Sequence, residues 1–500
     1  MEPLGTITKY YRFIDDESKS ILNSLMEESS SYYDFAQRLC EVVLENEVPV
    51  NLAYIAAVQA WWCRIEARMK SIHEKYKNVP WIKPWVYYHG SAERDQELQH
   101  DAVVQSIKTA IDSSLKDWIE TELHILHALF HYPMGEVISQ FEPLEKAKSL
   151  IDANPLLGCF ESIICALEGW TKLIEGDTKE ALVVLRRGRD LAEKNDDALY
   201  KYMNALNEGN TLRCVNAQDA SAVFEELYGL AQDLEVPFFI CEVLNDSSIV
   251  FNTLGEYDLA ISCHLEILKT LGELHPSDTL WEILSTTYAT LGDGQQALEW
   301  INKGFKSCGN FKSPLMLNLK AWALALLNRI DESEQILDTS HELIIKSGVE
   351  SYLGDYYFIS GVIELKKGNF LIALDSLEHA WEITERLPSG TNQIRVLLDL
   401  ARAEILIDNQ SLDSSKIVAP GRWLSKLEAL AVERDLPGVR MYAALLKSEF
   451  YQKHDQLKNA QAVLVDALEI TDSKGVATLR KRIIDRIQEI ESLIQEKEVV

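Results

Sequence analysis

A stripe of acidic and imidazole side chains is the part of the sequence whose residue types and spacing could do chemistry. Its members follow one another at intervals of four, three and four residues: Glu120, His124, His127 and His131. On a helix, this spacing places all four side chains along one face. Imidazoles that converge there can share a metal ion, and a carboxylate can complete the coordination shell.

The same stripe has a structural interpretation, which we favour. It runs beside an apolar stripe made of Ile119, Leu123, Leu126 and Phe130. The imidazoles would then form the partly buried flank of an amphipathic helix, with hydrogen bonds to their ring nitrogens. We therefore expect no bound metal and no other cofactor.

Short motifs of the common catalytic and nucleotide-binding sites are absent from the sequence. It contains no Gly-x4-Gly-Lys-Ser/Thr, no Gly-x-Ser-x-Gly and no His-Glu-x-x-His. We expect a protein that is not an enzyme. An α-helical enzyme with the histidine stripe as its reactive centre stays as an alternative, because acid–base sites can be assembled from distant residues.

The charge balance bears on the class of partner. The 500 residues carry a formal net charge of −29, which repels a phosphate backbone, so nucleic acid is not an expected partner. Two short basic groups interrupt this balance: Arg186, Arg187 and Arg189, and Arg480, Lys481 and Arg482. Both groups have acidic neighbours, so we interpret them as solvated helix faces.

Cysteine usage and hydropathy favour a cytoplasmic location. The eight cysteines are scattered among apolar residues without a Cys-x-x-Cys pair, which is typical of small buried side chains in a reducing compartment. The N-terminus lacks the apolar core of a signal peptide, and no apolar run approaches the ~18 residues that span a bilayer. We expect no interaction with a membrane.

Helical hairpins that repeat along the chain are its main organising feature. Residues Trp281–Phe305 are predicted to form two helices joined by a turn at Gly292, with Ser285 and Ala297 as small residues at the crossing. Further units align on a small residue early in their second helix: Ala181, Ala220 or Ala222, Ala260, Ala297, Ser333, Ala373 and Ala460. The clear steps are 37, 36 and 40 residues (260 to 297, 297 to 333 and 333 to 373), a period typical of a solenoid.

These hairpins resemble the tetratricopeptide-repeat (TPR) superfamily. The best match follows the family's Trp–Leu–small–Tyr–Gly–Ala order: Trp281, Leu284, Ser285, Tyr288, Gly292 and Ala297. Steps of ~36–40 residues exceed the family's usual period of about 34, and this longer spacing is similar to that of the MalT-like superhelix. The resemblance implies an all-α fold, a right-handed α-solenoid or superhelix of TPR-like hairpins.

The repeats divide the chain into three predicted parts. Residues 1–132 form an N-terminal helical region without the repeat, residues 133–472 the repeat array, and residues 473–500 a capping helix. A cap covers the apolar end of a solenoid, and a dimerising helix is the alternative. Within the N-terminal region we expect three helices and an aromatic break that plugs a core: Glu17–Glu28, Tyr33–Glu45, Asn51–Tyr76 and the break at residues 79–90.

The resemblance also implies which side chains face the concave groove. First helices line that groove in the family, so positions at a fixed distance before the aligned small residue should point into it. These positions and their acidic neighbours are Glu242, Asn245, Ile249, Asn252, Glu282, Thr286, Asn318, Trp322 and Asp355. The same count adds Ala289, Ala325, Val362 and Leu365. Asparagine carboxamides could bind an extended backbone, and Trp322 would add apolar area.

The function we expect is that of a noncatalytic scaffold or adaptor, which binds a partner peptide or helix in the groove. The acidic groove residues favour a neutral to basic protein or peptide partner. A MalT-like sensor or regulatory module that acts in trans, with a separate NTPase or DNA-binding chain, is the main alternative. The structural alternative for the same side chains is an ordinary solvated groove.

Overall fold

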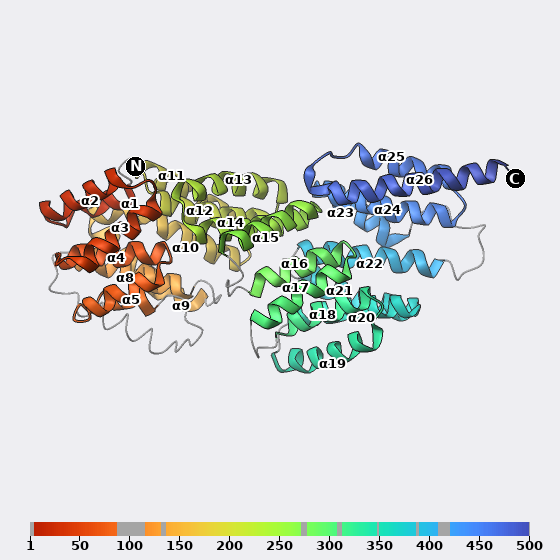
Figure 1. The fold of residues 1–500 in the computed structure, drawn as a ribbon, viewed down its shortest axis with the longest axis horizontal. Coiled ribbons are helices and arrows are strands. Elements are labelled where there is room, and N and C mark those ends of the chain that lie inside the picture. The colour runs from red at the N-terminus through yellow and green to blue at the C-terminus, as the bar shows by residue number, and fades with distance from the viewer. Residues whose placement is uncertain are drawn as a thin grey trace. The chain divides into compact units, whose positions relative to one another are not determined.

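The computed structural model describes residues 5–87, 116–131, 137–271, 278–307, 313–347, 350–386, 390–408 and 421–499. Helices dominate these residues, and no strand occurs among them (Figure 1). Two compact units divide the chain. Unit 1 comprises Met1–Val215 and Ala222–Val243, and unit 2 comprises Asn216–Ser221 and Leu244–Val500. This division falls inside the predicted repeat array, and the domain boundaries expected at residues 132 and 472 stay a prediction.

The N-terminal part of unit 1 consists of short helices. They are α1 (Gly5–Thr8), α2 (Asp16–Glu28), α3 (Tyr32–Glu45), α4 (Val50–Trp62), α5 (Glu66–Lys75), α6 (Lys83–Tyr87), α8 (Lys116–His131) and α9 (Val137–Ala153). The helices predicted at Glu17–Glu28 and Tyr33–Glu45 are confirmed by α2 and α3.

The single helix predicted for Asn51–Tyr76 is wrong, because the chain turns between α4 and α5. Arg64 adopts a left-handed backbone conformation with φ +57°. The amide of Ile65 donates to the carbonyl of Ala60 at 2.9 Å, and the amide of Arg64 donates to the carbonyl of Trp61 at 3.1 Å. This pair of hydrogen bonds is a Schellman motif, which ends a helix even without glycine or proline.

The aromatic break after α5 packs into the interior in part: Ile82 and Trp85 are buried, whereas Trp81 is half-buried. Trp85 is 3 % exposed, and its ring contacts those of Tyr54 and Trp61 at centroid distances of 6.2 and 5.6 Å. The prediction that this break plugs a core is confirmed for Trp85. Residues 88–90 of the break lie outside the described residues.

Paired helices follow along the rest of the chain. The pairs are α10 (Glu161–Ile174) with α11 (Thr178–Lys194), α12 (Ala198–Arg213) with α13 (Ala217–Leu234), α14 (Pro237–Leu254) with α15 (Tyr257–Leu271), α16 (Asp278–Thr290) with α17 (Gly294–Ser307), α18 (Pro314–Leu326) with α19 (Ile330–Ser347), α20 (Glu350–Lys367) with α21 (Phe370–Arg386), α22 (Gly390–Asp408) with α23 (Arg422–Glu433), and α24 (Pro437–Lys453) with α25 (Leu457–Leu468). The expected all-α solenoid of helical hairpins is confirmed.

The α16–α17 hairpin shows why these sequences form closely packed pairs. Ser285 and Ala297 are fully buried, and the Ser285 hydroxyl donates to the Ala297 carbonyl at 3.0 Å. Gly292 ends α16 with φ +83°, where the amide of Asp293 donates to the carbonyl of Tyr288 at 2.9 Å. Small side chains at the crossing therefore allow close approach, and glycine allows the left-handed turn.

The last elements of unit 2 contact its first ones. A Cβ atom added to Gly438, at the start of α24, would lie 2.3 Å from the carbonyl oxygen of Gly255 in the α14–α15 turn. The amide and hydroxyl of Thr478, in helix α26 (Ala477–Val499), donate to the carboxylate of Asp258 at 2.8 and 2.5 Å. Helices α24 and α26, at the end of unit 2, therefore contact the α14–α15 hairpin at its beginning.

Helix α26 packs against α24 and α25 and buries Leu479, Ile483 and Ile490. Among the described helices, none combines the length and the apolarity that crossing a bilayer requires. Most of the described cysteines are interior, as the sequence predicts: Cys40, Cys63, Cys165, Cys241 and Cys263 are buried, Cys159 is half-buried and Cys214 is exposed.

A cationic cavity in unit 2 as the candidate functional site

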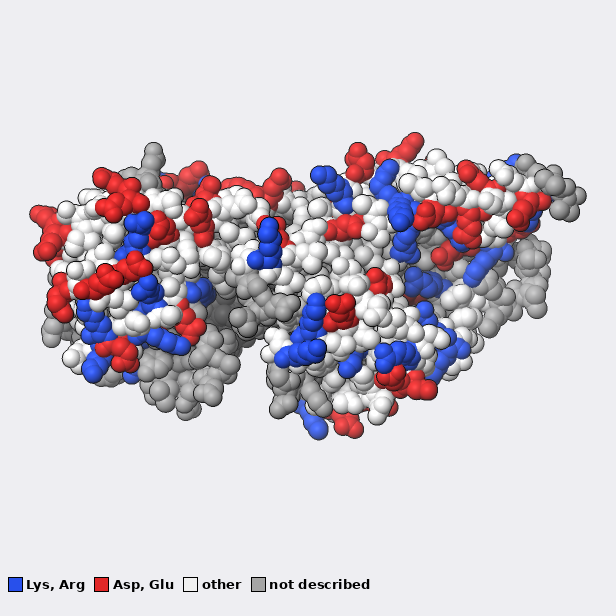
Figure 2. Space-filling model, viewed as in Figure 1, with Lys and Arg blue, Asp and Glu red and all other residues white. Residues whose placement is uncertain are grey.

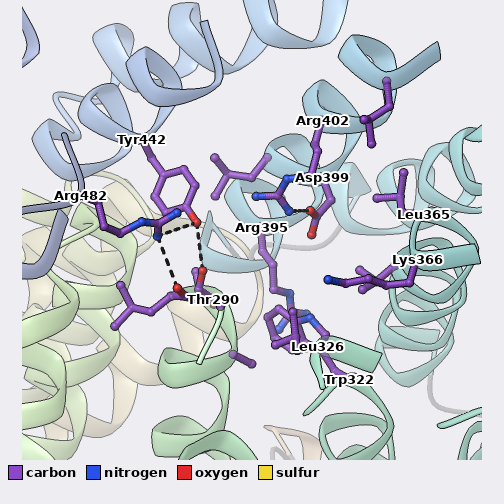
Figure 3. Close-up of a pocket in the computed structure, with 16 residues that line it drawn as sticks. Thr290, Trp322, Leu326, Leu365, Lys366, Arg395, Asp399, Arg402, Tyr442 and Arg482 are labelled. Atoms are coloured by element: carbon purple, nitrogen blue, oxygen red, sulfur yellow. Dashed lines mark hydrogen bonds and ion pairs between the residues drawn. The ribbon is translucent and has the colours of Figure 1, made fainter. Parts of the chain in front are cut away.

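A cavity of about 370 Å³ lies within unit 2 (Figure 3). Its walls come from the first helices of four successive hairpins, α16, α18, α20 and α22, while α24 and α26 contribute one side chain each. The apolar part of the wall consists of Trp322, Leu326, Val362, Leu365, Leu398 and Leu406, together with Ala289 and Leu291. The repeat architecture thus brings equivalent faces of consecutive hairpins to one space.

The charged part of the wall is cationic. It contains Lys366, Arg395, Arg402 and Arg482, against a single carboxylate, Asp399. This excess of positive charge contrasts with the net charge of −29 for the whole chain. It also contrasts with the face of the molecule in Figure 2, where acidic and basic side chains are interspersed. The cavity is therefore a local exception in an acidic protein.

Arg395 is the most deeply placed of these cations. The residue is 8 % exposed, and its guanidinium forms an ion pair with Asp355 at 2.5 Å. Its guanidinium carbon lies 5.2 and 4.6 Å from the ring centroids of Trp322 and Phe358. Burial raises the pKa of Asp355, and the Arg395 charge opposes this shift. Nε of Arg395 is buried and has no hydrogen-bond partner among the described residues.

Arg402 and Asp399 form a second ion pair one turn further along α22. Arg395, Asp399 and Arg402 are spaced by four and three residues, which places them on one face of this helix. The Asp399 charge raises the pKa of Arg402, while burial raises the pKa of Asp399. Each of the two arginines of α22 is thus matched by one carboxylate.

The remaining two cations, Lys366 and Arg482, are exposed and form no ion pair with the described residues, although the charge of Lys366 also acts on Asp399; we call them the surplus cations. Arg482 donates to the carbonyl of Leu291 at 3.4 Å and to the hydroxyl of Tyr442 at 3.3 Å. The Tyr442 hydroxyl donates in turn to the carbonyl of Thr290 at 3.4 Å, as Figure 3 shows. These contacts are long and uncharged on the acceptor side, so the charge of Arg482 is not neutralised.

Four of the positions counted from the aligned small residues line this cavity. Trp322 is among them, as are Ala289, Val362 and Leu365. Asp355 was expected to favour a basic ligand, but its carboxylate is neutralised by Arg395.

Two of the predicted asparagines are occupied by contacts within unit 2. The Asn318 carboxamide is fully buried: it donates to the Tyr352 carbonyl at 3.4 Å and accepts from the Ser340 hydroxyl at 2.7 Å. Asn252 is buried as well, and it accepts from the Thr287 hydroxyl at 3.0 Å. Because these groups connect neighbouring helices, we leave them out of the proposed binding surface.

The other predicted groove residues do not line the cavity. Glu242 belongs to unit 1, where it accepts from the hydroxyl of Tyr202 at 2.8 Å. Ala325 is fully buried. The half-buried members of the set are Asn245, Ile249, Glu282 and Thr286. Thr286 donates to a carbonyl of its own helix, that of Glu282, at 2.7 Å.

The histidine stripe lies on α8 in unit 1. His124 and His127 are both buried, Glu120 is half-buried, and the side chain of His131 lies outside the described residues. Burial lowers the pKa of His124 to about 4. In the described part of the chain, no group of three or more His, Cys, Asp or Glu side chains is placed to hold a metal ion.

Sequence reasoning missed the cations of the cavity. Lys481 and Arg482 are exposed, as the interpretation of a solvated face predicts, although Arg482 also lines the cavity. Arg480 departs from it, because this residue is half-buried and donates to the Leu468 and Thr471 carbonyls at 2.7 and 2.6 Å. The spacing of Arg395, Asp399 and Arg402 was a signal that could have been found, because it marks a charged stripe on an otherwise apolar helix.

Comparisons with known proteins found similarity to solved structures alone. No protein-family model matches the sequence, and a search of curated proteins gave no match. Similar solved structures include a tetratricopeptide repeat protein from Parabacteroides merdae, at 13 % identity and a TM-score of 0.35, with 65 % of this chain and 99 % of that chain covered.

Two further similar solved structures come from other organisms. Human IFIT1, solved as a dimer with PPP-AAAA, is 14 % identical, with a TM-score of 0.42 and 82 % and 89 % of the two chains covered. The STAND protein of Pyrococcus horikoshii with a tetratricopeptide repeat sensor is 13 % identical, with a TM-score of 0.44 and 71 % and 53 % covered.

The fold is that of a helical-repeat solenoid. Its helices follow one another as paired hairpins, and a solved tetratricopeptide repeat protein is among the structures that are similar to this chain. The similarity to MalT-like regulators stays a prediction.

Proposed function

We propose that this protein is a noncatalytic scaffold that binds a peptide or helix of a partner protein on the first helices of unit 2, at the cavity. One observation carries this proposal: α16, α18, α20 and α22, the first helices of consecutive hairpins, share a single cavity. A ligand there contacts several repeats at once, as an extended segment or a helix requires.

Apolar side chains at the cavity supply the contact area. Leu326, Leu365 and Leu406 are half-buried, so part of each side chain remains available to a ligand. Burying such leucine surface gives about 25 cal/mol for each Å² removed from water. A preformed surface also limits the ordering cost of binding.

The expected charge of the partner is not part of this proposal. A neutral to basic partner was inferred from acidic groove residues, but Asp355 is paired and Glu242 belongs to unit 1. The charges that line the cavity are mainly positive.

Selection of peptides from a random display library on the full-length protein tests the proposal. We expect a selected peptide to bind the Leu326→Ser/Leu365→Ser variant about tenfold or more weakly, because two apolar contacts are lost. The matched control is Ile345→Ser/Leu371→Ser, which changes exposed side chains of the second helices α19 and α21. Equal binding by both variants would argue against recognition at the cavity.

A further inference from the structure

We propose that unit 2 carries a second binding surface, which takes an arginine-containing peptide segment of a partner protein. Four rings on three successive helices and two aspartates beside them make up this surface, which we call the ring surface. Its members are His341 and Asp338 of α19, Tyr356 and Tyr357 of α20, and His379 and Asp375 of α21. None of them lines the cavity, so this inference goes beyond the proposed function.

The four rings form one continuous row. Helix α20 packs against both α19 and α21 (Figure 1), and each of its two adjacent tyrosines contacts one of these neighbours. The ring of Tyr356 stacks on that of His341, with a centroid distance of 4.5 Å and an interplanar angle of 24°. The ring of Tyr357 stacks on that of His379 at 5.4 Å and 29°. The two tyrosine rings lie 5.5 Å apart, edge to face, and join the two stacks.

This row reaches the surface of unit 2. His379 is exposed, whereas His341, Tyr356 and Tyr357 are half-buried, so part of each side chain stays accessible to a partner. Among the described residues, no lysine or arginine lies over the ring of Tyr356 or Tyr357. The negative faces of these rings therefore remain without a cation.

Each end of the row has a carboxylate beside it. Asp338 precedes His341 by three residues and Asp375 precedes His379 by four, so each aspartate shares a helix face with a ring. Both aspartates are exposed, and in the described part of the chain neither pairs with a lysine or arginine. Burial raises the pKa of the Tyr356 hydroxyl, and the charge of Asp338 raises it further. The Asp375 carboxylate lies 3.9 Å from Nδ1 of His379.

Elsewhere in unit 2, a ring and a carboxylate share one cation of the chain itself. Three such triplets are Lys303 with Trp300 and Glu299, Lys426 with Trp381 and Glu385, and Arg395 with Trp322 and Asp355. In the same order, the cations lie 3.9, 4.2 and 5.2 Å from the ring centroids and 3.3, 3.0 and 2.5 Å from the carboxylates. The ring surface has the rings and the carboxylates of this arrangement, and a cation of a partner would complete it.

Arginine fits the ring surface better than the other candidates do. A guanidinium can stack on an aromatic ring and donate to a carboxylate at the same time, whereas an ammonium is a more strongly hydrated point charge. Nucleobases would also stack on the rings, but Asp338 and Asp375 would repel the phosphates between them. In an extended peptide, arginines two residues apart project to the same side about 7 Å apart, close to the spacing of the tyrosine rings.

Isothermal titration calorimetry of the full-length protein tests the inference, with acetyl-Gly-Arg-Gly-Arg-Gly-amide as the probe. Mildly alkaline buffer with about 0.15 M salt screens the general attraction of a cation to an acidic protein. We expect this peptide to bind at least about tenfold more tightly than its glutamine analogue, because only arginine adds charge-assisted and cation–π contacts. The lysine analogue should bind about threefold more weakly than the arginine peptide, because it stacks less well.

The key variant is Tyr356→Leu/Tyr357→Leu, which removes both rings and leaves every charge in place. We expect it to bind the arginine peptide about fivefold more weakly. The Tyr356→Phe/Tyr357→Phe variant keeps the rings and should bind as the wild type does. The matched control is Tyr33→Leu/Tyr451→Leu, which makes the same change at two half-buried tyrosines outside the ring surface and should leave binding unchanged.

A second variant tests the carboxylates and does not depend on how the rings pack. Asp338→Asn/Asp375→Asn should weaken binding of the arginine peptide about fivefold, because both ionic contacts are lost. Its control, Asp190→Asn/Asp485→Asn, makes the same change of net charge at two exposed aspartates elsewhere. This control should lose no more than about twofold, because its charges act only at long range.

Several results would overturn the inference: no binding of the arginine peptide, equal binding of its glutamine or lysine analogue, undiminished binding by either key variant, an equal loss in a control, or tighter binding of a single-stranded oligoadenylate. The two proposals fail separately. The Leu326→Ser/Leu365→Ser variant changes the cavity and should bind the arginine peptide as the wild type does. A loss in that variant would place the arginine peptide at the cavity and would also overturn the ring surface.

Discussion

Unit 1 and unit 2 each bury charged side chains, but they compensate them differently. In unit 1, Glu122 is 4 % exposed and accepts hydrogen bonds from the hydroxyls of Tyr10 and Tyr54, both at 2.7 Å. In unit 2, Asp355 meets the opposite charge of Arg395. Neutral donors satisfy a carboxylate without adding charge, whereas an ion pair depends on both of its members.

Both units match the charges that they bury. Folding favours interior charges that are matched, as in the unit 1 pair of Lys9 and Asp197 at 2.8 Å. The surplus cations of unit 2, Lys366 and Arg482, are exposed, so water can solvate them and they need no partner in the fold.

The largest expected effect comes from breaking the ion pair of unit 2. Asp355→Ala leaves the buried guanidinium of Arg395 without its partner and should reduce the free energy of unfolding by about 3–5 kcal/mol. The measurement is urea denaturation followed by tryptophan fluorescence. In the Asp355→Ala/Arg395→Met variant, which also removes the charge, much of this loss should be recovered. Equal loss in the single and double variants would contradict the account.

Acid should weaken both units through buried neutral histidines. Burial lowers the pKa of His264 in unit 2 and of His124 in unit 1 to about 4 each, whereas the unfolded value is about 6.5. The unfolded state therefore binds the proton first. The stabilising contribution is full above about pH 6.5 and is lost as the pH falls towards about 4.

For His264, this linkage amounts to about 1.4 kcal/mol per pH unit and about 3 kcal/mol over the window. Chemical denaturation across that window should show a stability that falls less steeply with acid in His264→Gln than in the wild type. Parallel profiles of variant and wild type would refute the linkage. Comparisons between the two units are cleanest above about pH 6.5.

The neutral-donor cluster of unit 1 should respond more mildly than the ion pair. Glu122→Gln keeps one acceptor oxygen but turns the other into an amino group, so one tyrosine hydroxyl loses its acceptor. We expect a loss of about 1–3 kcal/mol in the free energy of unfolding. The control is Glu120→Gln on the same helix, which lies outside this cluster. Adding Tyr54→Phe to Glu122→Gln should cost less than Tyr54→Phe alone, and additivity would argue against shared hydrogen bonds.

The smallest effect on stability is expected for the surplus cations. Lys366→Gln and Arg482→Gln should each change the free energy of unfolding by no more than about 0.5 kcal/mol, because both side chains are exposed and neither forms an ion pair with the described residues. Urea denaturation without ligand provides the measurement. A loss comparable to that of Asp355→Ala would show that these charges support the fold and would remove the distinction between the two kinds of cation.

The repeat architecture could be predicted because its signals are local. Small residues such as Ser285 and Ala297 and turn residues such as Gly292 recur at a fixed period, and counting from them located Trp322 and Leu365 on the cavity wall. The same counting could not tell that Asn318 is covered, because its carboxamide also contacts the neighbouring hairpin, where it donates to the carbonyl of Tyr352 in α20.

The repeat pattern did not predict the cations of the cavity, for two reasons. Arg395 and Arg402 lie on α22, in the hairpin whose sequence matches the repeat least well, and Arg482 lies on the final helix outside it. The repeat pattern locates only those positions that have the same role in every hairpin. The charged side chains of the cavity differ from one hairpin to the next, so the repeat pattern could not locate them.

The contact between the two ends of unit 2 has a consequence for the order in which this part of the chain folds. Most contacts in a helical solenoid join neighbours in sequence, so hairpins can nucleate and grow with little loss of chain entropy. The hydrogen bonds from Thr478 to Asp258 instead join residues 220 positions apart. Closing a loop of that length becomes favourable once the intervening hairpins have shortened it, so closure should be a late step in the folding of unit 2.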